Sequence, residues 1–332
     1  MNKNKIKNKI KVILNWCASC GGCDVAILDV GRAILDLPKK LEILYWPVAL
    51  DFKRKDLESL KNKSIDIGII NGAIRTSEQE EEAKIFLNKC RNIVAFGSCA
   101  CFGGIPGLSN QYDKNEVMKR AYVEAPSNVN DGKAVPQPLS SVNDLNLTLP
   151  EFLEEVMPVD QVISVDYYVP GCPPSVSTIE ELFRAFSAIA KGKAQKKVFA
   201  SDKALCFECP HGKTKETKKV ESLFRPHEMI ASGEKCLLDQ GIVCLGFATR
   251  GGCGARCIRV NMPCRGCYGC LPTMFDPGAE AMSTIASIAG NGEDYMPTPR
   301  IMNVLDAVKD TIGIFYSFSL PSAVINKKGR QT

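Results

Sequence analysis

Cysteine is the residue type in this sequence with the clearest capacity for chemistry. The chain of 332 residues holds 16 cysteines and only 2 histidines. Many of the cysteines stand in closely spaced sets, such as CGGC at 20–23, CFEC at 206–209 and CRGCYGC at 264–270. Thiolates are soft ligands that select zinc, copper(I) or iron–sulfur clusters. The sequence therefore predicts metal sites built mainly from cysteine sulfur.

Disulfides explain these cysteines poorly if the protein works inside the cell. The basic N-terminus lacks the apolar core and the cleavage site of a signal peptide. No apolar run approaches the ~20 residues that a membrane span requires. We therefore expect a cytoplasmic protein without membrane insertion, in a compartment that keeps thiols reduced.

Apolar strand patterns alternate with amphipathic helix patterns through the first half of the chain. Strands are expected at 10–16, 41–47, 65–71, 92–97 and 162–170. Helices are expected at 23–37, where Pro38 would stop the first one, at 77–90 and at 175–189. Such alternation is typical of an α/β fold with a doubly wound parallel sheet. The stretch 124–150, rich in Pro, Asn and Ser, is expected to form a surface loop.

Four cysteines follow three of these predicted strands. Cys20 and Cys23 come after the first strand, Cys99 comes after the fourth and Cys172 comes after the fifth. Open α/β sheets bind ligands beyond the carboxyl ends of their strands, so these thiols should meet at one sheet edge. The neighbouring glycines allow close approach of the backbone and offer amide donors. This set is suited to a [4Fe–4S] cluster.

Nine further cysteines lie in the second half of the chain, where regular periodicity is weak up to about residue 277. A segment of this kind is expected to fold around its metals. We expect one domain at 1–195 and a cysteine-rich domain at 196–332. Eight of the nine cysteines would complete two more four-thiolate sites, although CxxC pairs also suit structural zinc. The nine are Cys206, Cys209, Cys236, Cys244, Cys253, Cys257, Cys264, Cys267 and Cys270.

Three other cysteines call for a different interpretation. Cys90 stands at the end of a predicted helix and is expected to be a buried apolar residue. Cys17 and Cys101 stand close enough to the first set to compete as ligands, and we expect them to be spare or to lie behind the ligands. The aromatic run from Phe315 to Phe318 is expected to fill the core.

The formal net charge of +5 counts every thiol as neutral. Each [4Fe–4S] cluster on four thiolates contributes about −2, so three clusters would bring the protein to roughly −1. Net basicity therefore gives little support to nucleic-acid binding, and no nucleic-acid partner is expected. The lysine-rich stretches at 191–197 and 211–219 are expected to be solvated.

The combined motifs resemble those of [NiFe] hydrogenase small subunits over nearly the whole chain. The residues that carry the resemblance are Trp16 before CGGC, GSCACFGG at 97–104 and GCPP at 171–174. The stretches CLLDQGIVCLGFATRGGCGARC and PCRGCYG are similar to cytoplasmic methyl-viologen-reducing hydrogenases that serve heterodisulfide reductase. The resemblance implies a flavodoxin-like sheet domain, followed by a mostly irregular iron–sulfur domain with C-terminal helices.

The resemblance also implies how the cysteines divide among three [4Fe–4S] clusters. The proximal cluster, nearest the active site of a large subunit, would bind Cys20, Cys23, Cys99 and Cys172. The medial cluster would bind Cys253, Cys257, Cys264 and Cys267. The distal cluster would bind Cys206, Cys209, Cys236 and Cys244. Many relatives have a [3Fe–4S] medial cluster, but Cys257 offers a fourth ligand here.

This chain departs from the family pattern at several positions. Many relatives use a histidine where Cys206 stands, so His211 and His227 are expected to be bystanders. The family often shows Glu-Gly after the third strand, where this chain has Asn71-Gly72. Cys270 is one cysteine more than the pattern needs.

The function implied by the resemblance is electron transfer. H2 would be split in a [NiFe] large subunit, and electrons would pass through the three clusters. The receiving partners would be a small iron–sulfur adaptor subunit and a heterodisulfide reductase-type complex. No catalytic residue is expected in this chain. Two alternatives stay open, namely a complex I-like or sulfhydrogenase electron-transfer subunit, and a zinc-stabilised scaffold without a redox role.

Overall fold

Five parallel strands form the central sheet of this computed structural model, which describes residues 9–212, 220–289 and 299–326. The strands are β1 (Ile10–Trp16), β2 (Leu41–Tyr45), β3 (Ile65–Asn71), β5 (Cys90–Phe96) and β9 (Tyr167–Val169). Their order across the sheet is β2-β1-β3-β5-β9, and every pair is parallel. This is the flavodoxin-type order of a doubly wound sheet, and its direction of winding reverses between β1 and β3. The expected α/β fold is confirmed.

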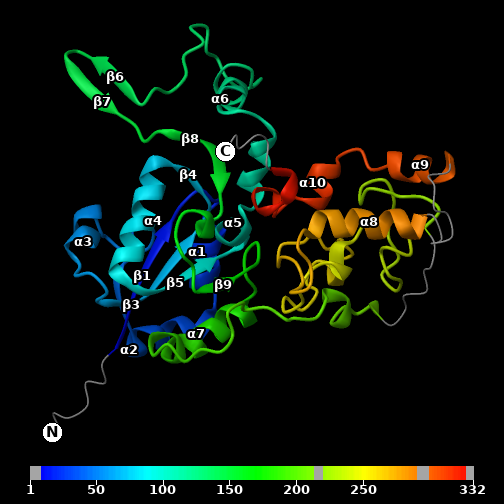
Figure 1. Cartoon of the computed structure of the whole chain (residues 1–332), viewed down its shortest axis with the longest axis horizontal. Helices are drawn as coiled ribbons and strands as arrows, with labels where there is room; N and C mark the ends of the chain where they lie inside the picture. Colours follow the sequence, from blue (N-terminus) through cyan, green and yellow to red (C-terminus); the bar gives the residue numbers. More distant parts are fainter. Residues whose placement is uncertain (1–8, 213–219, 290–298, 327–332) are drawn as a thin grey trace.

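Alternating side chains give the sheet two buried faces. Val94 and Phe96 of β5 face the helices α1 (Gly22–Leu28) and α7 (Val176–Ala190). Ile93 and Ala95 of the same strand face α3 (Arg54–Ser59) and α4 (Ser77–Lys89). Near-continuous apolar strands are expected in a sheet that is covered on both sides. Figure 1 shows these helices around the sheet, in the blue to green part of the chain.

Two expected elements are shorter than their apolar patterns. The fifth strand covers Tyr167–Val169 instead of 162–170. The apolar residues at 162–165 come directly after the 3-10 helix η3 (Val159–Gln161), and they pack onto a face of the sheet instead of joining its edge. The expected helix at 23–37 ends at Leu28, since Gly31 adopts a φ of 65°. A 3-10 helix, η1 (Gly31–Asp36), follows. Pro38 does not stop a helix but lies in the first turn of α2 (Leu37–Lys40), where proline is tolerated.

The segment between β5 and β9 contains short helices before residue 124 and a hairpin within the expected surface loop at 124–150. It begins with α5 (Ser98–Phe102), η2 (Ile105–Gln111) and α6 (Lys114–Tyr122). It continues with an exposed hairpin, β6 (Leu139–Val142) and β7 (Leu145–Thr148), which stands away from the sheet in Figure 1. It then returns through β8 (Phe152–Met157), which pairs antiparallel with β4 (Ile74–Thr76).

Regular structure is sparse among the described residues between 201 and 276, which leave out 213–219. The helices there are the single 3-10 turns η4 (Leu205–Phe207), η6 (Leu245–Phe247) and η7 (Ile258–Val260), within the described residues. The chain ends in α8 (Pro277–Ala289), α9 (Pro299–Asp306), α10 (Thr311–Phe315), η8 (Leu320–Ser322) and η9 (Val324–Asn326). These helices, orange to red in Figure 1, cover the irregular segment.

Phe315 and Tyr316 are buried in the core of this second half, as expected for the aromatic run. The lysine-rich stretch 191–197 is largely exposed, as expected, whereas 213–219 of the second stretch lies outside the described residues. No helix in the described part of the chain is both long enough and apolar enough to cross a membrane.

Candidate metal centres

The first group of cysteines gathers beyond the carboxyl ends of the parallel strands. Cys20 and Cys23 follow β1, Cys99 lies in the first turn of α5 after β5, and Cys172 follows β9. Burial raises the pKa of the Cys23 thiol, and the charges of the other three cysteines raise it further. Burial also raises the pKa values of Cys99 and Cys172, and the charge of Cys20 raises both further. The charge of Cys172 adds to the raised pKa of Cys99. The structure thus brings all four predicted thiols into coulombic range of one another.

Two glycines keep space open beside these sulfurs. A Cβ on Gly97 would lie 2.3 Å from Cys23 Sγ, and a Cβ on Gly104 would lie 2.4 Å from Cys99 Sγ. Both glycines have a positive φ, of 86° and 58°. L side chains rarely adopt such conformations. Glycine is therefore required here both by the backbone and by the clearance around sulfur.

A buried carboxylate stands next to this group. Asp24 directly follows Cys23 and is 1% exposed. Its two oxygens accept hydrogen bonds from Trp46 Nε1 at 2.8 Å and from Asn71 Nδ2 at 2.6 Å. Asn71, at the position where this chain departs from the Glu-Gly of the family pattern, thus holds the carboxylate of Asp24. The negative charge of Asp24 contributes to the raised pKa of Cys23.

The second group contains the four cysteines predicted for the distal site. Burial raises the pKa of Cys244 to about 11, and the charges of Cys206 and Cys236 raise it further. Burial also raises the pKa of Cys209, with a further rise from Cys236. Backbone N–H groups donate to the sulfurs of Cys209 and Cys244 and act in the opposite direction. Cys206 lies within the turn η4, and Cys244 directly precedes the turn η6.

The third group contains the four cysteines predicted for the medial site. Burial raises the pKa of Cys267 to about 12, and the charges of Cys253 and Cys257 contribute to the rise. Burial raises the pKa of Cys264 as well, followed by the charges of Cys244 and Cys267. Cys257 is exposed, unlike Cys264. Because charges of both Cys244 and Cys267 act on it, Cys264 lies between the second and third groups.

The three groups are joined in series through the third. Cys172 of the first group lies within coulombic range of Cys257 and Cys267. On the other side, the backbone N–H of Cys264 donates to Cys244 Sγ at 3.3 Å. The third group therefore contacts both of the others, which is the arrangement expected of a medial site.

Glu208 is a functional candidate that sequence reasoning missed. It lies inside the CFEC motif of the second group, but its carboxylate reaches the loop around Cys253 of the third group. It accepts the N–H of Gly252 at 2.9 Å and the N–H of Gly254 at 3.0 Å. Its position inside a cysteine pair was the available signal, but only the fold shows which loop it reaches.

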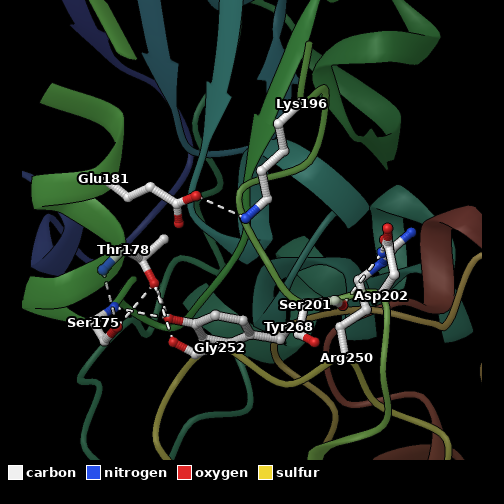
Figure 2. Close-up of polar contacts among 9 residues, drawn as sticks. All are labelled: Ser175, Thr178, Glu181, Lys196, Ser201, Asp202, Arg250, Gly252 and Tyr268. Carbon is white, nitrogen blue, oxygen red and sulfur yellow. Dashed lines mark hydrogen bonds and ion pairs between the residues drawn. The ribbon is translucent and has the colours of Figure 1, made fainter. Parts of the chain in front are cut away.

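Ser98 and Tyr268 are two further residues that the sequence did not single out. Ser98 Oγ, next to Cys99, donates to the backbone carbonyl of Cys267 at 2.6 Å. The hydroxyl of Tyr268 accepts the N–H of Ser175 at 3.0 Å, as Figure 2 shows. Both residues adjoin cysteines, and both connect the first group with the third.

Four cysteines lie outside the three groups. Cys17, Cys90 and Cys101 are buried among apolar side chains on the α3–α4 face of the sheet. This confirms the expectation for Cys90, which packs against Gly68. Cys101 Sγ donates to the carbonyl of Ala95 at 3.3 Å and lies behind the first group. Burial raises the pKa of Cys270, and the nearby charges that act on this thiol are those of Arg250 and Asp276, not those of other cysteines.

The surroundings of the three groups fit iron–sulfur clusters. Backbone N–H groups donate to sulfurs in each group, for example at Cys99, Cys209 and Cys253. Such hydrogen bonds stabilise thiolate ligands. Because burial raises the pKa values of Cys99, Cys209 and Cys253, cluster binding must displace the protons of these thiols. Within the described ranges, no three His, Cys, Asp or Glu side chains are arranged to hold a single metal ion.

Sequence comparison relates the whole chain to hydrogenase subunits. A family model described as NADH ubiquinone oxidoreductase, 20 Kd subunit, matches residues 20–186. The iron–sulfur subunit of the F420-non-reducing hydrogenase from Archaeoglobus profundus is 41% identical over 325 residues, which cover 96% of this chain and 98% of that protein. An F420-non-reducing hydrogenase subunit from Methanothermobacter marburgensis is 33% identical over 321 residues, with coverages of 96% and 97%.

Structural comparison finds the same overall fold in a solved hydrogenase. The recombinant [NiFeSe] hydrogenase from Desulfovibrio vulgaris Hildenborough, in the oxidised state, matches with a TM-score of 0.50 and 16% identity. The match covers 79% of this chain and 94% of that chain. At this identity, the likeness concerns the fold alone.

Proposed function

Since the chain belongs to the hydrogenase small-subunit family that includes these F420-non-reducing hydrogenase subunits, we propose that it conducts electrons through three [4Fe–4S] clusters. Membership of this family makes the chain a subunit of an oxidoreductase, with catalysis in the large subunit. The chain itself would contribute no acid, base or nucleophile. Its own task would be to hold the clusters and to set their potentials.

The observation that carries this proposal is the serial contact of three cysteine groups. Clusters pass single electrons when they lie near one another, and the protein sets their potentials through hydrogen bonds, burial and net charge. Cys172 and Cys267 join the first group to the third, and Cys264 and Cys244 join the third to the second. The first, third and second groups would bind the proximal, medial and distal clusters, in that order.

Cys257 supports a [4Fe–4S] cluster at the medial site. It supplies the fourth thiol of that group, and its charge contributes to the raised pKa of Cys172 as well as of Cys267. We propose the two-domain division at 1–195 and 196–332 on the same basis, with the proximal ligands in the first domain and the other eight in the second.

The proposed partners follow the path of the electrons. A large subunit with a nickel–iron centre would deliver electrons at the sheet edge that bears Cys20 and Cys172. A small iron–sulfur adaptor subunit and a heterodisulfide reductase-type complex would receive them near the second group. The motifs at 236–257 and 263–269 support this acceptor, and we propose a cytoplasmic location for the assembly.

A complex I-like role receives less support than the hydrogenase role. The family model named after the 20 Kd subunit stops at residue 186. The hydrogenase subunit from Archaeoglobus profundus matches 96% of the chain, including the second half with its nine cysteines. A zinc-stabilised scaffold remains the opposing hypothesis, because CxxC pairs also bind zinc.

Affinity purification of the tagged chain from its native cells, under anaerobic conditions, tests the proposal. We expect a nickel-containing large subunit to copurify, and exposure of the complex to H2 to bleach the visible iron–sulfur absorption. Replacement of H2 by argon is the control. A complex that binds nickel but shows no H2-dependent bleaching would contradict the proposed electron path.

A further inference from the structure

Tyr268 carries a buried hydroxyl at the junction of two cysteine groups. It directly follows Cys267 in the motif CRGCYGC and is 2% exposed. Burying a hydroxyl is costly unless it forms hydrogen bonds, and a phenylalanine would fill the same space without that cost. The hydroxyl therefore has to be explained by its partners.

Those partners belong to the start of α7, which follows Cys172. The hydroxyl of Tyr268 accepts the N–H of Ser175, the residue before α7, at 3.0 Å. It lies 3.0 Å from Thr178 Oγ1 in the first turn of the same helix. Because the Ser175 N–H occupies an acceptor site of the phenol, its own proton is available to Thr178. Figure 2 shows this network on the left of the view.

The network continues into the loop that carries Cys253. Thr178 Oγ1 donates to the carbonyl of Gly252, the residue before Cys253, at 3.5 Å. Ser175 Oγ lies 2.9 Å from Thr178 Oγ1, so the residue before α7 is also linked to the first turn of this helix. One phenol thus connects the segment after Cys172 with the two loops that hold Cys253 and Cys267.

Direct contacts between the first and third groups run beside this network. The backbone N–H of Cys172 donates to the sulfur of Cys267. Ser98 Oγ donates to the carbonyl of Cys267 at 2.6 Å. Segments of the first group therefore hold both the sulfur and the backbone of Cys267. Tyr268, the next residue, anchors the same loop.

We propose that Tyr268 is a positioning residue for electron transfer between the proximal and medial sites. Its hydroxyl network fixes the separation of Cys172 from Cys267 and Cys253, and so the gap that one electron crosses. The electron is lost by one site and gained by the other, and no bond or proton changes place. This inference rests on the proposed function, because it needs both sites to hold clusters.

The test compares Tyr268→Phe with Tyr45→Phe in the intact, anaerobically purified hydrogenase complex. Tyr268→Phe keeps the ring and removes the hydroxyl. Tyr45→Phe makes the same change at another buried tyrosine, in strand β2, and is the matched control. Iron and sulfide content is measured first, so that cluster assembly is known for each variant.

Three results are expected for Tyr268→Phe and none of them for Tyr45→Phe. Hydrogen exchange of the Ser175 amide becomes about tenfold faster, because this buried N–H loses its acceptor. The magnetic interaction between the reduced proximal and medial clusters weakens in electron paramagnetic resonance spectra. With methyl viologen as acceptor, kcat falls while KM for H2 is unchanged.

Thr178→Val breaks the same network from the side of α7, because it removes the contacts of Thr178 Oγ1 with Tyr268 and Gly252. It leaves the Tyr268 hydroxyl that accepts the Ser175 N–H. We therefore expect it to weaken the magnetic interaction and to lower kcat, with a smaller effect on exchange at Ser175. Unchanged magnetic interaction and unchanged kcat in both variants, together with faster exchange at Ser175 in Tyr268→Phe, would overturn the proposal and leave Tyr268 a purely structural residue. Lack of iron in the unsubstituted protein would contradict the proposed function instead, so the two failures are distinguishable.

Discussion

Cys257 decides which cluster type the third group holds. It is exposed, whereas Cys264 is buried and Cys267 is half-buried. We predict that Cys257→Ser removes about one iron per chain, because the [4Fe–4S] type requires four ligands. A new signal typical of an oxidised three-iron cluster should appear in electron paramagnetic resonance. The control is Cys270→Ser, which lies outside the three groups and should leave the iron content unchanged. Equal loss in both variants would refute the assignment of Cys257.

Glu208 joins the second group to the third through backbone amides. Its carboxylate accepts the N–H groups of Gly252 and Gly254. Glu208→Ala leaves these donors without their partner, so we predict a loss of about 1–3 kcal/mol in the local free energy of opening. Hydrogen exchange of the two glycine amides measures this loss. Glu208→Gln retains an acceptor oxygen and should lose much less. Equal effects of both substitutions would show that charge, and not the hydrogen bonds, is what matters.

At the scale of elements, the turn between β5 and α5 controls the first group. Gly97 combines a φ of 86° with a ψ of 158°, a region almost restricted to glycine that costs other residues about 1–3 kcal/mol. Its missing Cβ also leaves room for Cys23 Sγ. We predict that Gly97→Ala lowers iron occupancy of the proximal site, measured by iron content and by the proximal signal in electron paramagnetic resonance.

Gly192 provides the matched control for Gly97. It also has a positive φ, of 64°, but a Cβ there would meet nothing within 4 Å. Gly192→Ala should therefore carry the backbone cost without disturbing any thiol, and iron content should stay at its original level. If both alanine variants lose iron equally, the effect is general destabilisation, and clearance beside Cys23 plays no part.

The sequence predicted best those elements whose boundaries are set by their own residues, without help from distant contacts. Strands β1, β3 and β5 are short apolar runs bounded by turns, and their carboxyl ends fix where Cys20, Cys23 and Cys99 must meet. The overextended strand at 162–170 shows the limit of this signal, since Ile163 is apolar because it packs on the sheet face. Hairpin β6–β7 carries the apolar residues Leu139, Leu145 and Leu147, but all three are exposed, so its apolar residues do not mark a place in the core.

The residues that connect cysteine groups depend on tertiary proximity and were not predictable. Ser98 meets Cys267 across 169 residues, and Tyr268 meets Ser175 across 93. Nothing in the local sequence of either partner indicates the other. The cysteines themselves could be selected from their spacing, but the serial arrangement of the three groups required the fold.

At the scale of the whole molecule, the two halves differ in what holds them together. The sheet half has two continuous apolar faces. The described part of the segment 201–276 packs partly under the C-terminal helices and partly in a separate small core of seven buried residues, two of which are Cys244 and Cys264. Since such a segment depends on its metals, we predict that anaerobic chelation of iron abolishes hydrogen-exchange protection there, while amides of β1, β3 and β5 stay protected. Uniform loss across both halves, or none in either, would contradict this prediction.

Iron, zinc and acid-labile sulfide per chain, measured in anaerobically purified protein, test the electron path most directly. Three [4Fe–4S] clusters predict about twelve irons and about twelve sulfides per chain, with negligible zinc. About one iron fewer would reduce the medial site to three irons and would remove Cys257 from its ligands. Zinc with little or no sulfide would contradict the proposed conduction of electrons, and would leave the cysteine groups as structural sites.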